Sequence, residues 1–274
     1  MSVVGRHAPT PSGHLHLGNA LAFSAAWLSV RSQGGRLLLR IEDLDRGRAR
    51  DDIAEAQRHD LQWLGLTWDH ETAPQSTRAY PLDGLPTYRC ACSRKKRLRG
   101  DCACRNTPAT EGTWRFACPP GIVSFTDRAQ GPQAHPPGAD PIVRRRNGEA
   151  AYPHAVVLDD FRDGVTEVVR GADLLQATAV QIRIAEALDL PLPTFLHVPM
   201  VLGPDGRKLS KSHGSTELRA LRDAGWTADD VWATLLPFLG LQVGSLDEAR
   251  HAFDPAVIPA GPFTVDERGR LVGS

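Results

Sequence analysis

The stretch RHAPTPSGHLHLGNALAF near the start of the chain constrains the fold more than any other segment. An apolar entry at Val3 and Val4 leads into it, and Pro9 and Pro11 then fix the backbone and remove hydrogen-bond donors. Gly13 adds backbone freedom, so the chain must turn here. The pattern predicts a short strand that ends in a turn.

The residues after this turn predict a helix and a second strand. After His16, the letters LGNALAFSAAWLSVR place apolar residues near helical spacing, and Gly34 and Gly35 then supply a stop. RLLLRIE follows as a continuous apolar run, which is typical of a strand buried on both faces of a parallel sheet. Strand, turn, helix and strand form a βαβ unit, so we expect an α/β fold with a parallel sheet.

The rest of the chain predicts more α/β structure with an interruption. A second helix is expected at about residues 49–64, and the abundance of Pro, Gly, Cys and Arg at about 69–148 indicates an insertion. AYPHAVVLDDF and VTEVVRG alternate like strands, a helix is expected at about 172–188, and FLHVPMVL indicates another buried strand. We expect a main domain over residues 1–213 and a short helical region over 214–274, ending in a Pro- and Gly-rich tail.

Composition limits the classes of partner. Lys and Arg total 32, as do Asp and Glu, so the net charge is zero and predicts no general attraction to nucleic acid or to a membrane surface. No apolar run approaches the roughly 18 residues that span a bilayer, and no signal-peptide pattern opens the chain. We expect a cytoplasmic protein without a membrane partner, and a monomer is the simplest expectation.

Two segments far apart in the chain have the composition of phosphate sites. Backbone amides at a helix start are unpaired and the helix dipole adds positive charge, while His16 can donate to a phosphate oxygen and Gly18 lets a nucleoside approach. An ordinary capped turn with exposed histidines is the alternative. In KLSKS, Lys208 and Lys211 could neutralise a departing pyrophosphate, or simply form a solvated basic loop.

Together, HLGN and KLSKS resemble the HIGH and KMSKS elements of class I aminoacyl-tRNA synthetases. RHAPTPSGHLHLGNAL, GGRLLLRIEDLDRGRAR, VVLDD, VTEVVRGADLL and KLSKS narrow the resemblance to glutamyl-tRNA synthetases over about residues 3–215. The resemblance implies a Rossmann-type catalytic domain over residues 1–213 that uses ATP with Mg²⁺. The residues it implies in ATP binding are His16, Gly18, Asn19, Lys208, Leu209, Ser210 and Lys211. The resemblance also implies that His16, Lys208 and Lys211 are catalytic, with Lys211 as the main cation that stabilises the transition state.

The resemblance also implies a pocket for L-glutamate, whose two carboxylates need cations and whose ammonium needs an anion. Arg6 and Arg170 would bind the carboxylates and Glu42 the ammonium. The rest of the wall would be Ala8, Thr10 and Tyr152. Many full-length members carry Asn four residues after the tyrosine, whereas this chain has Val156, which predicts weaker glutamate binding. The acids interpreted as structural are Asp43, Asp45, Asp159 and Asp160.

The short region after KLSKS points to one branch of this family. Residues 214–274 are too few for the large helical region with which a full-length glutamyl-tRNA synthetase reaches the anticodon. The chain is therefore similar to the truncated glutamyl-queuosine tRNA(Asp) synthetases, which transfer glutamate to the queuosine base in the anticodon loop of tRNA(Asp). One alternative is a truncated glutamyl-tRNA synthetase that charges a tRNA 3′ end. Another is a zinc-containing RNA-binding module without catalysis.

Four of the five cysteines lie close together, in CACSRKKRLRGDCAC. Two CxC pairs separated by nine residues favour a tetrahedral zinc site over free thiols. The predicted ligands of one structural Zn²⁺ are Cys90, Cys92, Cys102 and Cys104. The related family has a tyrosine where Gly100 stands here, and Cys102 is interpreted as the substitute ligand. Cys118 is expected in the core.

Basic residues gather in and near the predicted insertion. One run lies between the two cysteine pairs and consists of Arg94, Lys95, Lys96, Arg97 and Arg99, and a second run occupies residues 144–146. A charge run is usually a solvated surface. In this class the insertion faces the nucleic acid, so we expect phosphate contacts and a salt-dependent affinity.

Overall fold

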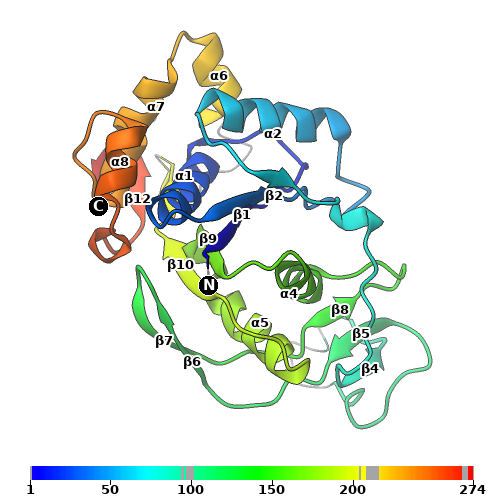
Figure 1. The fold of residues 1–274 in the computed structure, drawn as a ribbon. Coiled ribbons are helices and arrows are strands. Elements are labelled where there is room, and N and C mark those ends of the chain that lie inside the picture. Colours follow the sequence, from blue (N-terminus) through cyan, green and yellow to red (C-terminus); the bar gives the residue numbers. More distant parts are fainter. Residues whose placement is uncertain are drawn as a thin grey trace.

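A mostly parallel β-sheet in two parts forms the centre of the chain in this computed structural model, which describes residues 2–93, 96, 102–203, 205–207, 216–266 and 271–273 (Figure 1). The first part has the order β1-β2-β3, with strands β1 (Val4–His7), β2 (Arg36–Leu39) and β3 (His70–Glu71). The second has the order β7-β6-β10-β9, with strands β6 (Val123–Asp127), β7 (Gly131–His135), β9 (Glu167–Gly171) and β10 (Thr194–Val198). The parts meet where the Thr166 amide donates to the Val4 carbonyl, with an N to O distance of 2.9 Å.

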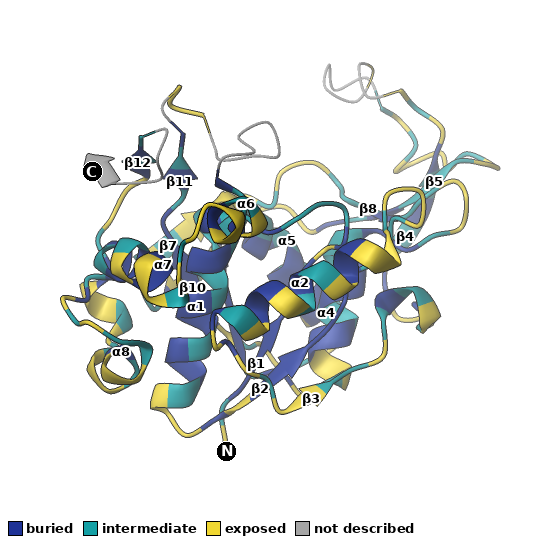
Figure 2. Cartoon of the chain, turned by 90° about the horizontal axis from the view of Figure 1, so that it is seen from above, coloured by how far each residue is buried: buried dark blue, intermediate teal, exposed yellow. Residues whose placement is uncertain are grey.

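The predicted βαβ unit at the start of the chain is confirmed. Helix α1 (Leu17–Ser32) connects β1 to β2, which pair in parallel. Gly34 follows the helix with φ of +64°, a left-handed conformation that glycine adopts without steric cost. Much of α1 is buried, including Leu21 and Leu28, so this helix packs into the core of the molecule (Figure 2).

Two further helices lie close to where the sequence predicts them. Helix α2 (Asp51–Trp63) buries one face and exposes the other (Figure 2). Helix α5 (Leu175–Ala187) follows the short 3-10 helix η2 (Ala172–Leu174). No helix in the described part of the chain is both long and apolar enough to cross a membrane.

The prediction of a strand in AYPHAVVLDDF is wrong, because this segment forms helix α4 (Tyr152–Arg162). Its buried side chains recur at helical spacing, with His154, Ala155 and Asp159 on the inner face. Pro153 lies in the first turn, where a helix needs no backbone donor from it. The alternation in the letters therefore concealed a helix that buries carboxylates as well as apolar groups.

After β3, the described residues up to 148 contain a small antiparallel sheet and a hairpin. The sheet has the order β4-β5-β8, with strands β4 (Thr87–Cys90), β5 (Thr113–Phe116) and β8 (Ile142–Arg144). Phe116 and Val143 of this sheet pack against Ile184 of α5, so the segment shares a core with the rest of the chain. The β6–β7 hairpin extends the main sheet through the pairing of β6 with β10. The domain boundaries at about 69, 148 and 213 stay predictions.

The expected strand FLHVPMVL is divided into two strands. After β10, Pro199 cannot donate to a strand neighbour, and β11 (Val201–Leu202) joins a different sheet. The helices that follow are α6 (Leu218–Asp223), α7 (Ala228–Leu235) and α8 (Leu246–Ala252), with the 3-10 helices η4 (Leu236–Leu239) and η5 (Pro255–Val257). The expected Pro- and Gly-rich tail contains two strands, β12 (Phe263–Val265), which pairs with β11, and β13 (Leu271–Gly273).

Two buried histidines predict how stability depends on pH. Burial lowers the pKa of His7 to about 3 and that of His154 to about 4. Below pH 6.5 the unfolded chain binds protons that the folded chain excludes, so the free energy of unfolding should fall as the pH drops toward 4. The slope is at most about 1.4 kcal/mol per pH unit for each histidine. We expect the double variant His7→Asn, His154→Asn to flatten this dependence, measured by urea unfolding between about pH 4.5 and pH 7.

A matched control for this measurement is His251→Asn, because His251 is exposed on α8. This variant should keep the pH dependence of the unchanged protein. Equal pH dependence in the double variant and the unchanged protein would contradict the assignment.

Candidate functional site

A cavity of about 340 Å³ opens at the carboxyl ends of the parallel strands, beside the N-terminus of α1. This edge of a parallel sheet is where α/β folds usually bind ligands. Nine of the residues predicted for the site line the cavity: Arg6, Ala8, Thr10, His16, Gly18, Asn19, Glu42, Tyr152 and Arg170. The predicted residues Lys208, Leu209, Ser210 and Lys211 lie outside the described residues. Four separated segments of the sequence therefore meet at one cavity.

Arg6 is held by an ion pair beneath the cavity. Its Nε donates to Oδ1 of Asp160 at 3.1 Å, and its Nη1 donates to the carbonyl of Val169 at 3.3 Å. Burial opposes ionisation of Asp160, but Arg6 and Arg40 outweigh it and lower the pKa of this carboxyl. The guanidinium is thus fixed in orientation, and none of the described residues accepts a hydrogen bond from its Nη2.

Glu42 lies at the same cavity on the segment after β2. Its Oε1 accepts a hydrogen bond from Nη2 of Arg40 at 3.3 Å, and its side chain is almost fully buried. Burial raises the pKa of Glu42, while Arg40 and Arg6 oppose this shift. The carboxylate would be favoured further by a cationic group in the cavity, because a buried anion needs partners.

Arg170 is a buried cation whose partners among the described residues are all neutral. Its Nη2 donates to Oγ1 of Thr178 at 2.8 Å and to Oε1 of Gln181 at 2.7 Å. Its Nη1 donates to the Tyr152 hydroxyl at 3.4 Å, and among the described residues no carboxylate forms an ion pair with it. Burial lowers the pKa of Arg170. An anionic ligand in the cavity would balance this charge.

Behind Arg170, a buried histidine and aspartate complete a chain of hydrogen bonds that sequence reasoning missed. Nε of Arg170 donates to Nε2 of His197 at 3.0 Å, and Nδ1 of His197 lies 2.6 Å from Oδ2 of Asp127. Because Nε2 accepts, the neutral ring carries its proton on Nδ1 and donates it to Asp127. Burial lowers the pKa of His197, which keeps the ring neutral. Asp127 lies 43 residues before Arg170 in the sequence, and no local motif links the two.

His16 caps α1 with its side chain, which changes the predicted phosphate site. Its Nδ1 accepts hydrogen bonds from the amides of Gly18 at 3.1 Å and Asn19 at 3.3 Å. Two of the amides expected to be unpaired are therefore used. In the neutral ring the proton is on Nε2, which could donate to a phosphate oxygen. A Cβ on Gly18 would lie 3.2 Å from Nδ1 of His16, so this glycine also makes room for the cap.

The other residues singled out from the sequence lie around this cavity in different roles. Val156 borders a separate, apolar cavity of about 540 Å³ and is not among the residues that line the cavity of 340 Å³. The four acids interpreted as structural each have a partner within the chain: Asp43 binds Ser76, Asp45 pairs with Arg48, Asp159 pairs with Arg78, and Asp160 pairs with Arg6 and Arg40. Cys118 is buried in the core, as expected.

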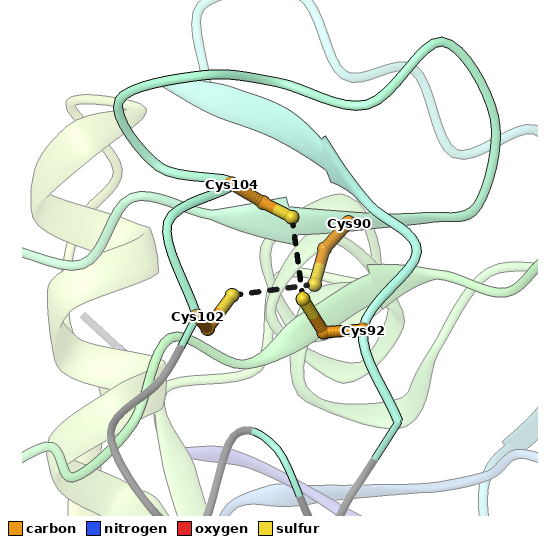
Figure 3. Close-up of side chains that lie close together, drawn as sticks. All are labelled: Cys90, Cys92, Cys102 and Cys104. Carbon is orange, nitrogen blue, oxygen red and sulfur yellow. Dashed lines mark hydrogen bonds between the residues drawn. The ribbon is translucent and has the colours of Figure 1, made fainter.

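The four predicted cysteines converge at the end of β4 (Figure 3). All four Sγ atoms lie within 4.8 Å of one another. Cys90 and Cys102 are 3.7 Å apart and Cys92 and Cys104 are 3.5 Å apart, measured between Sγ atoms. Four thiolates around a tetrahedral Zn²⁺ with Zn–S bonds of about 2.3 Å would be about 3.8 Å apart. The donor set and its spacing fit a structural zinc ion.

Comparison with known proteins gives consistent relatives. The family described as "tRNA synthetases class I (E and Q), catalytic domain" matches residues 2–92 and 94–252. Two curated relatives are named glutamyl-Q tRNA(Asp) synthetase. The one from Symbiobacterium thermophilum is 39% identical, over 95% of this chain and 95% of the relative. The one from Nitratidesulfovibrio vulgaris is 40% identical, over 93% of this chain and 95% of the relative. The glutamate-tRNA synthetase structure from Elizabethkingia anophelis superposes with a TM-score of 0.82 at 22% identity, over 98% of this chain and 69% of that one. This structural likeness shows the fold.

The cysteine cluster predicts a bound metal. Protein purified without chelator should contain about one Zn²⁺ per chain by inductively coupled plasma mass spectrometry. Cys92→Ser removes one of the four thiolates and should lower the zinc content strongly. Cys118→Ala is the matched control and should retain zinc, because Cys118 lies in the core away from the cluster. A zinc content far below one per chain in the unchanged protein would rule the site out.

Proposed function

Because the chain belongs to the family of class I tRNA synthetases for glutamate and glutamine, we propose that it activates glutamate with ATP and transfers it to the queuosine base of tRNA(Asp). The observation that carries the proposal is Arg170, a buried guanidinium at the cavity with neutral partners only among the described residues. The receiving RNA is inferred from the name of the curated relatives, which match nearly the whole chain.

The cavity can bind glutamate by charge complementarity. Arg170 and Arg6 present two guanidinium groups for two carboxylates, and Glu42 presents one carboxylate for the ammonium. Tyr152 donates or accepts through its hydroxyl beside Arg170, while Ala8 and Thr10 leave room for the aliphatic chain. A neutral or cationic amino acid brings one carboxylate in place of two, so it cannot pair with both guanidinium groups, and an Arg170 left without that carboxylate stays buried without a counter-charge, which is costly.

Activation needs positioning and charge neutralisation more than a protein base. The α-carboxylate of glutamate attacks the α-phosphorus of ATP, a new P–O bond forms, and pyrophosphate leaves. Nε2–H of His16 would donate to a phosphate oxygen at the start of α1. Mg²⁺ would arrive with ATP and balance phosphate charge. Lys208 and Lys211 are proposed, from the family resemblance alone, to neutralise the leaving pyrophosphate.

Transfer completes the proposed reaction. A hydroxyl oxygen of the cyclopentenediol ring on the modified base attacks the activated carbonyl carbon. The carbonyl–phosphate bond breaks, AMP leaves, and the hydroxyl proton passes to water. The product is a glutamyl ester on the base. The zinc site would stabilise the β4–β5 region and takes no part in these bonds, since the cysteines are not among the residues that line the cavity.

The destination of labelled glutamate tests the proposal. With ATP and labelled glutamate, we expect label in tRNA(Asp) from queuosine-containing cells and none in the same tRNA from cells that lack queuosine. Acid-precipitable counts measure the transfer, and nuclease digestion locates the labelled nucleotide. Label on the terminal adenosine of tRNA(Glu) would support the truncated glutamyl-tRNA synthetase instead. Absence of glutamate-dependent ATP–pyrophosphate exchange would leave the non-catalytic RNA-binding module.

The Asp127 and His197 chain predicts a positioning effect on glutamate binding. In Asp127→Asn, an amide can donate to Nδ1 of His197 and move the ring proton to Nε2, which then opposes Nε–H of Arg170. We expect KM for glutamate to rise about tenfold, equivalent to about 1.4 kcal/mol, with a smaller change in kcat and little change in KM for ATP. Pyrophosphate exchange measures all three.

Asp69→Asn is the matched control for this variant. Asp69 accepts a hydrogen bond from the Leu37 amide and pairs with Arg31, away from the cavity. It should leave KM for glutamate unchanged even where it lowers the melting temperature. The positioning role is wrong if Asp127→Asn changes only the melting temperature.

A further inference from the structure

A second polar cavity, of about 440 Å³, lies between the segment after Glu42, the 3-10 helix η1 (Gln75–Thr77) and the turn after β8. Leu44 lines it on one side, two residues after Glu42. Ala150 lines it on another, two residues before Tyr152. Since Glu42 and Tyr152 line the first cavity, the second cavity is connected to the proposed glutamate site by two very short lengths of chain.

Two arginines of this cavity have no acidic partner among the described residues, and the one acid in the described lining, Glu149, pairs with Arg145 instead. Nη2 of Arg46 donates to the carbonyl of Ser76 at 2.8 Å, and Nη2 of Arg144 donates to the carbonyl of Tyr80 at 2.6 Å. Carbonyl groups fix the orientation of a guanidinium without neutralising it. Within the described ranges, no carboxylate forms an ion pair with either arginine. A third arginine, Arg78, differs because Asp159 and Asp163 pair with it.

We propose that this cavity binds one nucleotide of the RNA substrate, with its phosphate on Arg46 and Arg144. Guanidinium groups bind phosphate oxygens through charge-assisted hydrogen bonds, and such phosphate contacts position an RNA without reading its sequence. Asn147, at the turn after β8, supplies an amide at the rim. The proposal rests on the proposed function for the identity of the RNA, and it assigns that RNA a docking point beside the glutamate pocket.

RNA binding by arginine variants of the full chain tests the proposal. The probe is an anticodon stem–loop RNA of tRNA(Asp), with the dissociation constant measured by fluorescence anisotropy over a series of salt concentrations. We expect Arg46→Ala and Arg144→Ala each to weaken binding by about tenfold at low salt. Each should also reduce the slope of log K against log salt by about 0.7 to 0.9, the value for one lost phosphate contact.

Arg250→Ala on α8 is the matched control, because α8 lies on the other side of the molecule from β8 (Figure 1). Arg250 also has an acidic partner, Asp247, at 3.0 Å. This variant should bind the stem–loop with the affinity and salt slope of the unchanged protein. Equal losses in all three variants, or no loss in any of them, would overturn the proposal.

Two further measurements separate the remaining outcomes. Glutamate-dependent ATP–pyrophosphate exchange without RNA should be unchanged in Arg46→Ala and Arg144→Ala, which shows that the variants fold and that the first cavity is intact. A mixture of nucleoside monophosphates is the second probe. If the variants lost binding of this mixture but bound the stem–loop normally, the cavity would serve a free nucleotide and the proposal would fail.

The outcomes also separate this proposal from the proposed function. Weakened stem–loop binding in both arginine variants, with no glutamate transferred to queuosine by the unchanged protein, would support the docking point and contradict the function. Normal stem–loop binding in both variants, with glutamate transferred by the unchanged protein, would support the function and contradict the docking point.

Discussion

The fully buried guanidinium of Arg40 is the constraint on which the proposed site depends. It pairs with Asp160 at 2.7 Å, Asp163 at 3.0 Å and Glu42 at 3.3 Å, so it joins the segment after β2 to the end of α4. Removing a charge from water is costly, and loss of one partner leaves the others buried and unpaired. Asp160 also holds Arg6. One cation thus fixes the position of both an anion and, through Asp160, a second cation at the cavity.

The sequence predicts the βαβ unit because hydrophobic spacing determines it locally. The cavity residues Arg6, His16 and Glu42 were predicted from the family resemblance, and they meet at one end of the sheet because they come from this single unit. The cysteines were predictable for a similar reason, since their spacing alone indicates a ligand set. Helix α4 was not, because its inner face carries Asp159 and Asp160 as well as apolar groups. Those acids are buried only because arginines from distant segments pair with them.

The parts of the site that sequence reasoning missed depend on contacts between distant residues. Asp127 and His197 are 70 residues apart, and only the pairing of β6 with β10 brings them together. The cap on α1 was missed for another reason. A histidine side chain is not a typical N-cap, yet the Nδ1 atom of His16 accepts two backbone amides. The ring therefore occupies the place where free amides were expected, and its Nε2 is the atom proposed to contact a phosphate.

The β6–β7 hairpin is linked to the proposed glutamate pocket through Arg170. Asp127, at the end of β6, supports His197 behind the guanidinium, and Tyr152, at the start of α4, contacts the guanidinium from its own element. A shift of the hairpin relative to β10 would remove the support of His197 and leave the Tyr152 contact in place. A ligand that binds the hairpin differently in its shifted and unshifted positions would therefore alter the proposed binding of glutamate as well, because coupling between sites is reciprocal. The hydrogen bonds that join Asp127, His197 and Arg170 are the physical route for that coupling, since each group bonds the next.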